Sequence, residues 1–328
     1  MTSPAMAPIS PDDASPTSQV EISVVVPVYR SAPMLPELHR RLIDALGSLA
    51  ERYEIILVED GGGDDSWSVI ERLAEQDDHV RGIRMSRNYG QHNALLCGIR
   101  AARYELIVTL DDDLQNPPEE MGKLVDRLVA EDVDVVYGTP ANEQHGFLRD
   151  RGSQITKLAL QSAMGAETAR NVSAFRVFRT RLRDAFEPYR GPFVSIDVLL
   201  TWGTTRFSHV SVRHEPRREG RSNYTLRQLA THAFNMMTGF STLPLQIASF
   251  VGFLFILFGF GILAIVLLTY IANGGSTVPG FAFLASIIAI FSGAQLFALG
   301  IIGEYLARIH FRTMDRPAYI VSDVTDDD

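Results

Sequence analysis

The sequence predicts an α/β domain, with a mostly parallel sheet flanked by helices, that is joined to a membrane module. Two observations lead to this fold class. Short apolar runs alternate about five times with segments of helical periodicity, which is the pattern of right-handed βαβ units. The chain then has no Asp, Glu, Lys or Arg from residue 228 to residue 303, which is 76 of its 328 residues. A soluble domain of ordinary composition does not leave such a gap.

The first part of the chain alternates predicted strands and helices. A nearly continuous β-branched run at residues 22–28 is typical of a buried parallel strand. Further apolar runs predict strands at residues 54–58, 80–85, 105–110 and 133–137. Helical spacing predicts helices at residues 35–49, 66–76 and 89–103, and the prolines and glutamates of residues 117–120 begin another. Beyond residue 138 a weaker pattern predicts a helix near residues 148–164 and strands near 172–178 and 207–213.

Two apolar segments near the C-terminus are long enough to cross a membrane. Residues 243–272 and 281–303 each exceed the roughly 20 apolar residues that a bilayer requires. Arg308, Arg312 and Arg316 follow the second span, while the linker between the spans has no charge. By the positive-inside rule we expect a hairpin in the inner (plasma) membrane, with the N-terminal domain and both termini in the cytosol.

The remaining segments complete the predicted domain organisation. Residues 1–20 are rich in Pro, Ser, Asp and Ala and lack the basic start and apolar core of a signal peptide, so we expect a disordered tail. The soluble domain covers residues 21–224, the membrane helices cover 243–309, and a cytosolic tail covers 310–328. Between domain and membrane, residues 225–242 carry apolar side chains at helical spacing. This pattern favours an amphipathic helix in the membrane interface, with a core-packed helix as the alternative.

Charge and cysteine content narrow the functional classes. The net charge of −9 argues against broad nucleic-acid binding, which depends on clustered positive charge. The single cysteine, Cys97, excludes an internal disulfide. Its apolar neighbours predict a buried and unreactive thiol.

Three polar clusters follow predicted strands, at the points where the strands end. Pro27, Tyr29 and Arg30 follow the first strand, residues 59–61 follow the second, and the acidic triplet 111–113 follows the fourth. In open parallel sheets, ligands bind at the carboxyl ends of the strands. We therefore expect these clusters to form one functional site.

The acidic triplet has the composition of a metal site. Asp111, Asp113 and Gln115 offer carboxylate and amide oxygens, which suit Mg²⁺ or Mn²⁺ held together with substrate phosphates. Adjacent carboxylates repel one another unless a positive charge neutralises them. A solvated acidic turn is the alternative.

The glycine-rich turn after the second strand suits a nucleotide. Asp60 and Asp64 flank three glycines, which allow close backbone approach, and such a carboxylate accepts bonds from a ribose hydroxyl or a base N–H. A turn with Asp65 or Ser66 as helix N-cap is compatible with this interpretation. The glycine patterns of P-loop and Rossmann phosphate sites are absent from the sequence.

A basic segment before residue 225 suits a phosphate. Arg217, Arg221 and Ser222 surround a glycine, which favours a phosphate-gripping loop, and attraction to anionic headgroups is the alternative. Arg149 and Arg176 are weaker candidates for phosphate contact. Further weak candidates, each with helix capping as the alternative, are His92 and Asn93 near the site and Asp197 for the sugar or base.

Several longer motifs resemble known proteins. V-x-D-G-x-x-D, R-N-Y-G-Q-H-N-A-L and L-D-D-D-L-Q-N-P-P-E-E resemble inverting family 2 glycosyltransferases with the GT-A fold. R-x-x-G-x-S-x-Y before two spans, then G-A-Q-L-x-x-x-G-I-I-G-E-Y-L-A-R-I and R-P-x-Y-I-V, are similar to polyprenyl-phosphate glycosyltransferases. The nearest group is the undecaprenyl-phosphate 4-deoxy-4-formamido-L-arabinose transferases, and dolichol-phosphate mannose synthase is more distant. The resemblance covers roughly residues 21–320 and implies a GT-A-like sheet.

The resemblance also implies roles for particular residues. Asp111, Asp113 and Gln115 match the metal and diphosphate motif. The positions that match the nucleotide pocket are Pro27, Tyr29, Asp60 and Asp64. Arg217 and Ser222 match the acceptor phosphate loop, with Arg221 as a helper. The chain departs from the family at Arg30-Ser31, at Asn223 and at Ala174, where members carry Asn-Glu, often Lys, and sometimes Asp.

The reaction implied by the resemblance is inverting, metal-dependent transfer of a sugar from a nucleotide-sugar, with UDP favoured, to a polyprenyl phosphate. The implied partners are therefore the donor, the lipid phosphate and the bilayer, together with a homo-oligomer, which is a tetramer in many members. One alternative is a GDP-mannose-dependent polyprenyl-phosphate mannose synthase. Another is an inactive membrane scaffold, which the intact Asp60, Asp111, Asp113 and Gln115 argue against. A processive polysaccharide synthase is disfavoured because the sequence lacks Q-x-x-R-W.

Overall fold

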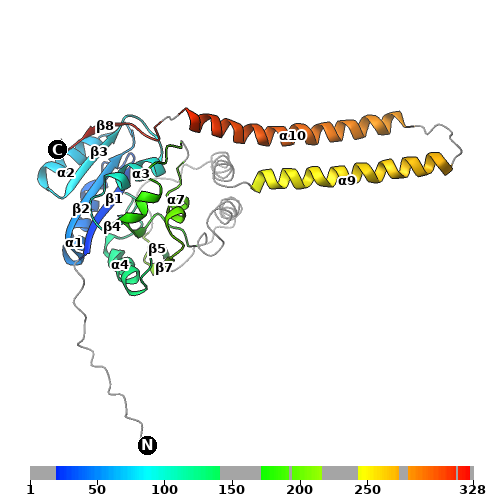
Figure 1. Cartoon of the computed structure of the whole chain (residues 1–328). Coiled ribbons are helices and arrows are strands. Elements are labelled where there is room, and N and C mark those ends of the chain that lie inside the picture. Colours follow the sequence, from blue (N-terminus) through cyan, green and yellow to red (C-terminus); the bar gives the residue numbers. More distant parts are fainter. Residues whose placement is uncertain are drawn as a thin grey trace, which may run out of the picture.

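A computed structural model of the chain describes residues 20–140, 171–191, 194–215, 243–272, 280–314 and 317–325. The tail predicted before residue 20, the helix predicted near residues 148–164 and the interfacial helix predicted at residues 225–242 lie outside these ranges. The described part consists of an α/β domain and a long helical hairpin that extends away from it (Figure 1).

A mixed sheet of eight strands forms the centre of the described domain. The strands are β1 (Val20–Val28), β2 (Ala50–Glu59), β3 (Val80–Met85), β4 (Leu106–Thr109), β5 (Val135–Pro140), β6 (Arg176–Arg179), β7 (Phe207–Val212) and β8 (Val321–Val324). Their order across the sheet is β7-β5-β6-β4-β1-β2-β3-β8. The ladder from β4 through β1 and β2 to β3 is parallel, as is the pair β5–β7, while β6 and β8 run antiparallel to their neighbours. The prediction of a mostly parallel sheet is confirmed.

Helices cover both faces of this sheet. One face carries α1 (Leu35–Leu49), α2 (Ser66–Gln76) and α4 (Met121–Ala130), and the other carries α3 (Gln91–Ala101), the 3-10 helix η2 (Thr180–Ala185) and α7 (Ile196–Gly203). Alternation along β1 explains the two layers, because Val24 and Val26 enter the first core cluster and Val25 enters the second. A strand buried on both sides is mainly apolar, which accounts for its β-branched run, and the buried Ser23 donates a hydrogen bond from its hydroxyl to Glu54. The 3-10 helix η1 (Pro118–Glu120) begins at the predicted proline signal and leads into α4.

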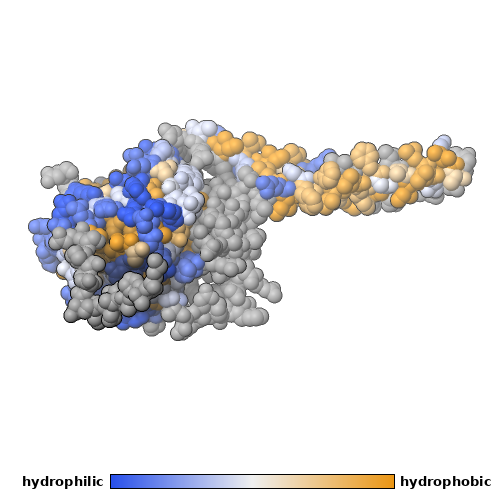
Figure 2. Space-filling model, turned by 60° about the horizontal axis from the view of Figure 1, so that its bottom comes forward, coloured by the Kyte–Doolittle hydropathy of each residue, from blue (hydrophilic) through white to orange (hydrophobic). Residues whose placement is uncertain are grey.

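The hairpin consists of α9 (Leu243–Ala272) and α10 (Phe281–Thr313). Its long apolar side chains point outward, with Phe250 62%, Leu268 68% and Leu296 69% exposed. Figure 2 shows the same contrast, because the hairpin is coloured mainly as hydrophobic and the domain is not. Two segments, Leu245–Ala272 and Ile290–Ala307, have the length and composition of membrane spans. Water does not favour an apolar surface of this size, so the hairpin needs an apolar environment.

The end of the chain returns from the hairpin to the domain. β8 pairs with β3 at the edge of the sheet, and Thr325 N donates to Gly82 O at 3.0 Å. Ala318, which is 6% exposed, joins the core on the α3 face. The sequence indicated a separate tail from residue 310, whereas α10 runs to Thr313 and β8 belongs to the sheet. Because the chain leaves the domain before α9 and rejoins it after α10, both ends of the hairpin lie on the domain's side (Figure 1).

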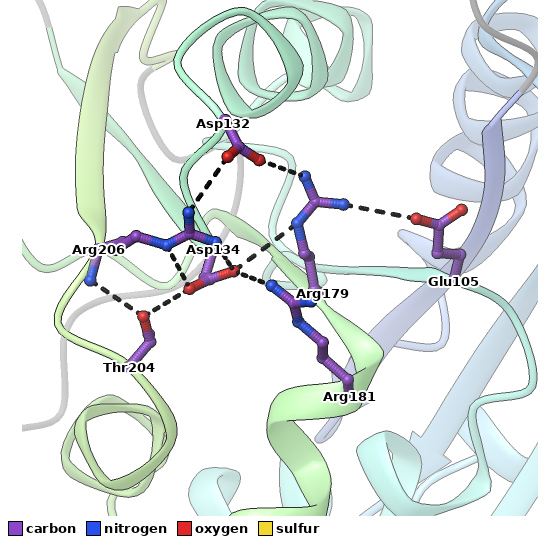
Figure 3. A network of polar contacts seen from close by, with 7 residues as sticks. All are labelled: Glu105, Asp132, Asp134, Arg179, Arg181, Thr204 and Arg206. Atoms are coloured by element: carbon purple, nitrogen blue, oxygen red, sulfur yellow. Dashed lines mark hydrogen bonds and ion pairs between the residues drawn. The ribbon is translucent and has the colours of Figure 1, made fainter.

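A network of arginines around one buried acid ties β5, β6 and β7 together (Figure 3). The side chain of Asp134 is 7% exposed and accepts hydrogen bonds from Arg206 Nε at 3.0 Å, Arg181 Nη2 at 2.7 Å and Thr204 Oγ1 at 2.6 Å. Arg179 Nε lies 3.7 Å from the same carboxylate. The Arg206 guanidinium, followed by the other donors, holds the pKa of Asp134 well below its ordinary value against the opposing effect of burial.

We expect Asp134→Asn to lower the thermal midpoint of the domain, because three guanidinium groups lose a charged partner. Arg181 and Arg206 are 62% and 45% exposed, so solvent screens these pairs. We expect a loss of about 1–2 kcal/mol. Since the pKa of Asp134 is depressed, the stabilisation is complete above its unfolded pKa and is lost as pH falls through the folded pKa.

Thermal unfolding of both proteins across pH checks this prediction. The difference between wild type and Asp134→Asn should be largest near neutral pH and should shrink below about pH 4, where an ordinary Asp becomes protonated. Asp132→Asn is the matched control, because its carboxylate is 78% exposed in the same network. Equal losses in the two variants would contradict the prediction.

Candidate active site

The carboxyl ends of three neighbouring strands meet, as the sequence predicts. β1 lies between β2 and β4, with Val28 opposite Glu59 and Val25 opposite Thr109. Parallel pairing brings the loops after these strands to one edge of the sheet. We call the residues of these loops, 27–31, 59–64 and 111–115, the strand-end site.

The middle acid of the triplet braces the site internally. Tyr29 N donates to Asp112 Oδ2 at 3.1 Å, which joins the loop after β1 to the loop after β4. Burial raises the pKa of the Asp112 carboxyl, against the opposing hydrogen bonds from Ser31 and Tyr29. Leu114 takes a left-handed φ of +59° and is 2% exposed. Burial of its side chain stabilises a backbone conformation that an L-residue otherwise disfavours.

Asp111, Asp113 and Gln115, the predicted metal ligands, are half-buried on this single turn. Gln91 Nε2 donates to Asp111 Oδ1 at 2.6 Å, and Gln115 N donates to Asp113 Oδ1 at 3.1 Å. Within the described ranges, no group of three or more His, Cys, Asp or Glu side chains is placed to hold a metal ion by itself. Two carboxylates and an amide oxygen instead fit Mg²⁺ or Mn²⁺ that takes its other ligands from water and a substrate diphosphate.

Asp60 braces the start of α3. Its Oδ1 and Oδ2 accept hydrogen bonds from Tyr89 N at 2.7 Å and from Gly90 N at 2.8 Å. The residue is 3% exposed, and burial raises the pKa of its carboxyl although the two N–H bonds oppose the shift. Asp60 therefore holds the residues before α3 in place, and its contact with a nucleotide stays a prediction.

The loop after β1 carries an exposed aromatic ring beside a cation. Pro27 is buried in β1, whereas Tyr29 is 44% exposed. The Arg30 guanidinium lies 5.2 Å from the centre of the Tyr29 ring, and Arg30 Nε donates to Gly62 O at 2.9 Å. Arg30 thus links the first loop to the glycine turn. The residue that departs from the family pattern has a defined place at the strand-end site.

Asp64 closes the glycine turn from an exposed position. Ser66 Oγ donates to Asp64 Oδ2 at 2.8 Å, and it accepts a bond from Ser31 N at 3.1 Å. Asp65 occupies the N-cap position of α2, as the sequence suggested, but its side chain makes no capping hydrogen bond. Asp64 and Ser66 join the first two loops.

Two candidates from the sequence lie buried in the structure and pair with each other. Arg176 was a candidate for phosphate contact, but it is 2% exposed and its guanidinium is paired with Asp197. Asp197 was a candidate for contact with sugar or base, but it is 5% exposed and also accepts a bond from Tyr137 Oη at 3.2 Å. A buried charge requires a partner of opposite sign, and each of these residues satisfies the other. Spacing along the sequence could not reveal this pair, because Arg176 lies on β6 and Asp197 lies on α7.

The segment after β7 leads from the strand-end site toward the predicted phosphate loop. Glu215 N donates to Gln115 O at 2.9 Å, so this segment lies against the acidic turn. The predicted phosphate-binding residues Arg217, Arg221, Ser222 and Arg149 lie outside the described ranges.

Four residues shape the site through partners that the sequence did not reveal. Gln91, Asp112, Arg30 and Glu215 each make a contact between segments that follow different strands. Gln91 and Asp112 lie within two of the motifs that resemble family 2 glycosyltransferases. The motifs do not indicate which groups these residues contact. Arg30 belongs to the polar cluster that the sequence places after the first strand, whereas Glu215 carries no sequence signal of a contact.

Comparison with known proteins identifies the class. Residues 23–189 match the family model "Glycosyl transferase family 2". Undecaprenyl-phosphate 4-deoxy-4-formamido-L-arabinose transferases from Sodalis glossinidius and Shewanella sediminis are 34% and 37% identical to this chain. These alignments cover 92% of this chain, with 93% and 92% of the relatives. The chain therefore belongs to glycosyl transferase family 2, and it is a glycosyltransferase.

A solved structure supports the fold. Glucosyl-3-phosphoglycerate synthase from Mycobacterium tuberculosis, in complex with Mn²⁺, uridine diphosphate and phosphoglyceric acid, superposes with a TM-score of 0.50. It is 16% identical in sequence and covers 67% of this chain and 76% of its own. The GT-A-like fold expected from the motifs is confirmed.

Two glycines of the site predict a contrast between matched substitutions. Gly61 and Gly63 both have positive φ, at +62° and +70°. A Cβ on Gly61 would lie 2.4 Å from the backbone of Arg87 and Asn88, whereas a Cβ on Gly63 meets nothing within 4 Å. We expect Gly63→Ala to cost about 1 kcal/mol through backbone strain alone, and Gly61→Ala to cost about 3 kcal/mol or more.

Thermal unfolding of the two variants measures this contrast. Gly61→Ala should lower the midpoint by several degrees more than Gly63→Ala, because the backbone of the facing loop cannot give way as a flexible side chain would. Similar midpoints would show that the loop containing Arg87 and Asn88 moves aside at little cost.

Proposed function

We propose that this glycosyltransferase transfers a sugar from a nucleotide-sugar to a polyprenyl phosphate in the membrane. The observation that carries the proposal is the hydrogen bond from Glu215 N to Gln115 O at 2.9 Å. This bond joins the acidic turn, which suits a diphosphate and its metal, to the segment that precedes Arg217 by two residues. Arg217, Arg221 and Ser222 are the predicted phosphate-binding residues. Transfer requires donor and acceptor phosphate to meet at such a junction. The names of the relatives specify undecaprenyl phosphate and support this acceptor class.

On the donor side, Pro27, Tyr29, Asp60 and Asp64 line or support the nucleotide pocket, with a UDP-sugar as the favoured donor. The ligands for Mg²⁺ or Mn²⁺ are Asp111, Asp113 and Gln115. When bound, such a metal neutralises negative charge that develops on a departing diphosphate. Gln91, Asp112 and Arg30 keep the loops in register so that the donor's diphosphate and anomeric carbon are held in one orientation.

On the acceptor side, Arg217 holds the lipid phosphate behind the anomeric carbon, with help from Arg221, Ser222 and Arg149. A phosphate monoester has a second pKa near about 6, so at neutral pH it is largely dianionic and is itself the nucleophile. One phosphate oxygen forms the bond to the anomeric carbon as the bond to the diphosphate breaks, which inverts that carbon. The reaction then needs no general base, in keeping with Ala174 at the position where some family members carry Asp.

The membrane arrangement follows from the same proposal. α9 and α10 span the inner membrane, and the domain and both termini lie in the cytosol. The charge pattern after the second span and the pairing of β8 with β3 support this orientation. Residues 225–242 lie in the interface, where a lipid phosphate would reach the site. A homo-oligomer, a tetramer in many proteins that the sequence resembles, completes the proposal.

A transfer assay tests the proposed activity. Purified protein in detergent is incubated with polyprenyl phosphate, Mg²⁺ or Mn²⁺ and a panel of UDP- and GDP-sugars, and products are read by mass spectrometry. We expect one glycolipid, formed from one lipid phosphate and one sugar, and its loss with EDTA. Asp113→Asn should lower turnover by at least about 100-fold, because the departing diphosphate loses electrostatic stabilisation. Asp65→Asn, an exposed acid near the same site, should leave turnover unchanged.

The other outcomes separate the alternatives. A glycolipid formed only from GDP-mannose would replace the UDP-sugar assignment with the mannose synthase alternative. Donor hydrolysis without glycolipid would overturn the acceptor assignment. Absence of turnover with every donor, in protein shown to be folded, would favour the membrane scaffold.

Cysteine labelling tests the proposed orientation. The native Cys97 is 4% exposed, and burial raises its pKa to about 12, so a membrane-impermeant maleimide should not label the wild type. Ser276→Cys lies between the spans in sequence and should react in spheroplasts with intact membranes. Ser322→Cys, exposed on β8, should react only after the membrane is permeabilised. Labelling of both sites from outside would refute a cytosolic domain.

A further inference from the structure

The segment after β7 is held by charged groups as well as by its main chain. Residues 213–215 follow β7, and they contact Gln115 of the acidic turn, Glu120 of η1 and, as a third partner, Arg41 of helix α1. Glu215 N donates to Gln115 O at 2.9 Å, and Arg213 N donates to Glu120 Oε2 at 3.2 Å. Arg213 Nε also donates to Glu120 Oε1 at 2.9 Å. The third contact joins Glu215 to helix α1.

Arg41 of α1 is the centre of that third contact. Its side chain is 8% exposed and makes a bidentate pair with Glu119, through Nε at 2.8 Å and Nη2 at 2.7 Å. The same Nη2 lies 3.4 Å from Glu215 Oε1. The bidentate geometry fixes the plane of the guanidinium, so Nη2 presents a defined donor to Glu215.

The position of Arg41 is unusual for its helix. α1 buries a leucine face of Leu35, Leu38, Leu42 and Leu46 against the sheet, and Arg41 is buried beside it. The Nη1 atom of Arg41 is also buried and has no hydrogen-bond partner among the described residues. Burial of a guanidinium is costly unless it is paired, and an apolar residue of similar size would pack there at lower cost. A local stabilising role therefore explains this arginine poorly.

We infer that Arg41, with Glu119 and Glu215, forms a clamp that sets the distance between the donor turn and the acceptor phosphate loop. This inference rests on the proposed function and adds positioning residues to it. Glu119 lies four residues after Gln115, and Glu215 lies two residues before Arg217, so the arginine bridges the two loops that hold opposite reactants. A displacement of about 1 Å at such a junction is enough to lower transfer strongly.

The clamp acts on the acceptor more than on the donor. The donor turn is braced independently by Asp112 and Gln91. Residues 213–215, in contrast, are held by contacts with Gln115, Arg41 and Glu120. Loss of the clamp should therefore weaken use of the lipid phosphate and spare use of the nucleotide-sugar.

Steady-state kinetics with each substrate varied in turn tests the inference. Glu215→Gln keeps the main-chain bond to Gln115 and leaves the Arg41–Glu119 pair intact, so the fold should survive. We expect its KM for polyprenyl phosphate to rise about tenfold and its KM for the nucleotide-sugar to change less than about twofold. The double variant Arg41→Gln/Glu215→Gln should be no worse than Arg41→Gln alone, because both changes break one contact.

Arg40→Gln is the matched control. Arg40 lies next to Arg41 on α1 but is 60% exposed, and its partners among the described residues are Glu37 and Asp44 of the same helix. Both KM values should remain those of the wild type. Equal increases of the two KM values in Glu215→Gln, or additive effects in the double variant, would overturn the clamp as a positioning device.

Hydrogen exchange provides a readout that does not depend on activity. In Arg41→Gln, the amides of Arg213 and Glu215 should exchange at least about tenfold faster than in the wild type, while those of the core strand β1 keep their rates. If the wild type makes no glycolipid, the proposed function fails, and with it the part assigned to the clamp in acceptor use. If transfer proceeds but exchange is unchanged in Arg41→Gln, the clamp fails and the proposed function stands.

Discussion

The parallel pairing of β1 with β2 and β4 is the constraint on which the rest of the structure depends. It places the ends of three strands within one edge of the sheet, and every candidate donor contact follows from those ends. The same pairing concentrates acids, since Glu59, Asp60 and residues 111–113 come together there. Such a group of carboxylates is stable only if its charges are hydrogen-bonded, neutralised by a cation or removed by protonation. In these loops Asp60, Asp111, Asp112 and Asp113 each accept at least one hydrogen bond.

The acids of the site differ in the groups that donate hydrogen bonds to them. Asp60 and Asp112 accept main-chain N–H groups from neighbouring loops, and burial raises the pKa of both. They hold the loops of the site together, with Asp60 buried and Asp112 half-buried like its neighbours. Asp111 and Asp113, the proposed metal ligands, are half-buried on the turn and accept hydrogen bonds from Gln91 Nε2 and Gln115 N. A displacement reaction is fast only when its reactants are held in one orientation, and loops joined by hydrogen bonds provide such a rigid site.

The hairpin α9–α10 and strand β8 connect the domain that carries this site to a long apolar surface. A domain joined by one flexible tether could adopt many orientations, whereas this chain is attached to the helices at two points. β8 completes the sheet beside β3, and Ala318 is buried in the domain core. The two attachments restrict how the domain stands relative to the helices.

The sequence by itself determined the elements whose signal is local. Apolar periodicity predicted β1 through β5, the start of α4 and both hairpin helices, because burial pattern and length are properties of a short window. It also determined which residues follow the strand ends. Only the tertiary structure decided the partners: that Arg176 faces Asp197, that Asp60 caps residues before α3, that Arg41 reaches Glu215, and that residues 321–324 return to β3. An ion pair or an edge strand depends on groups far apart in the chain, and their meeting is fixed by packing rather than by any local pattern.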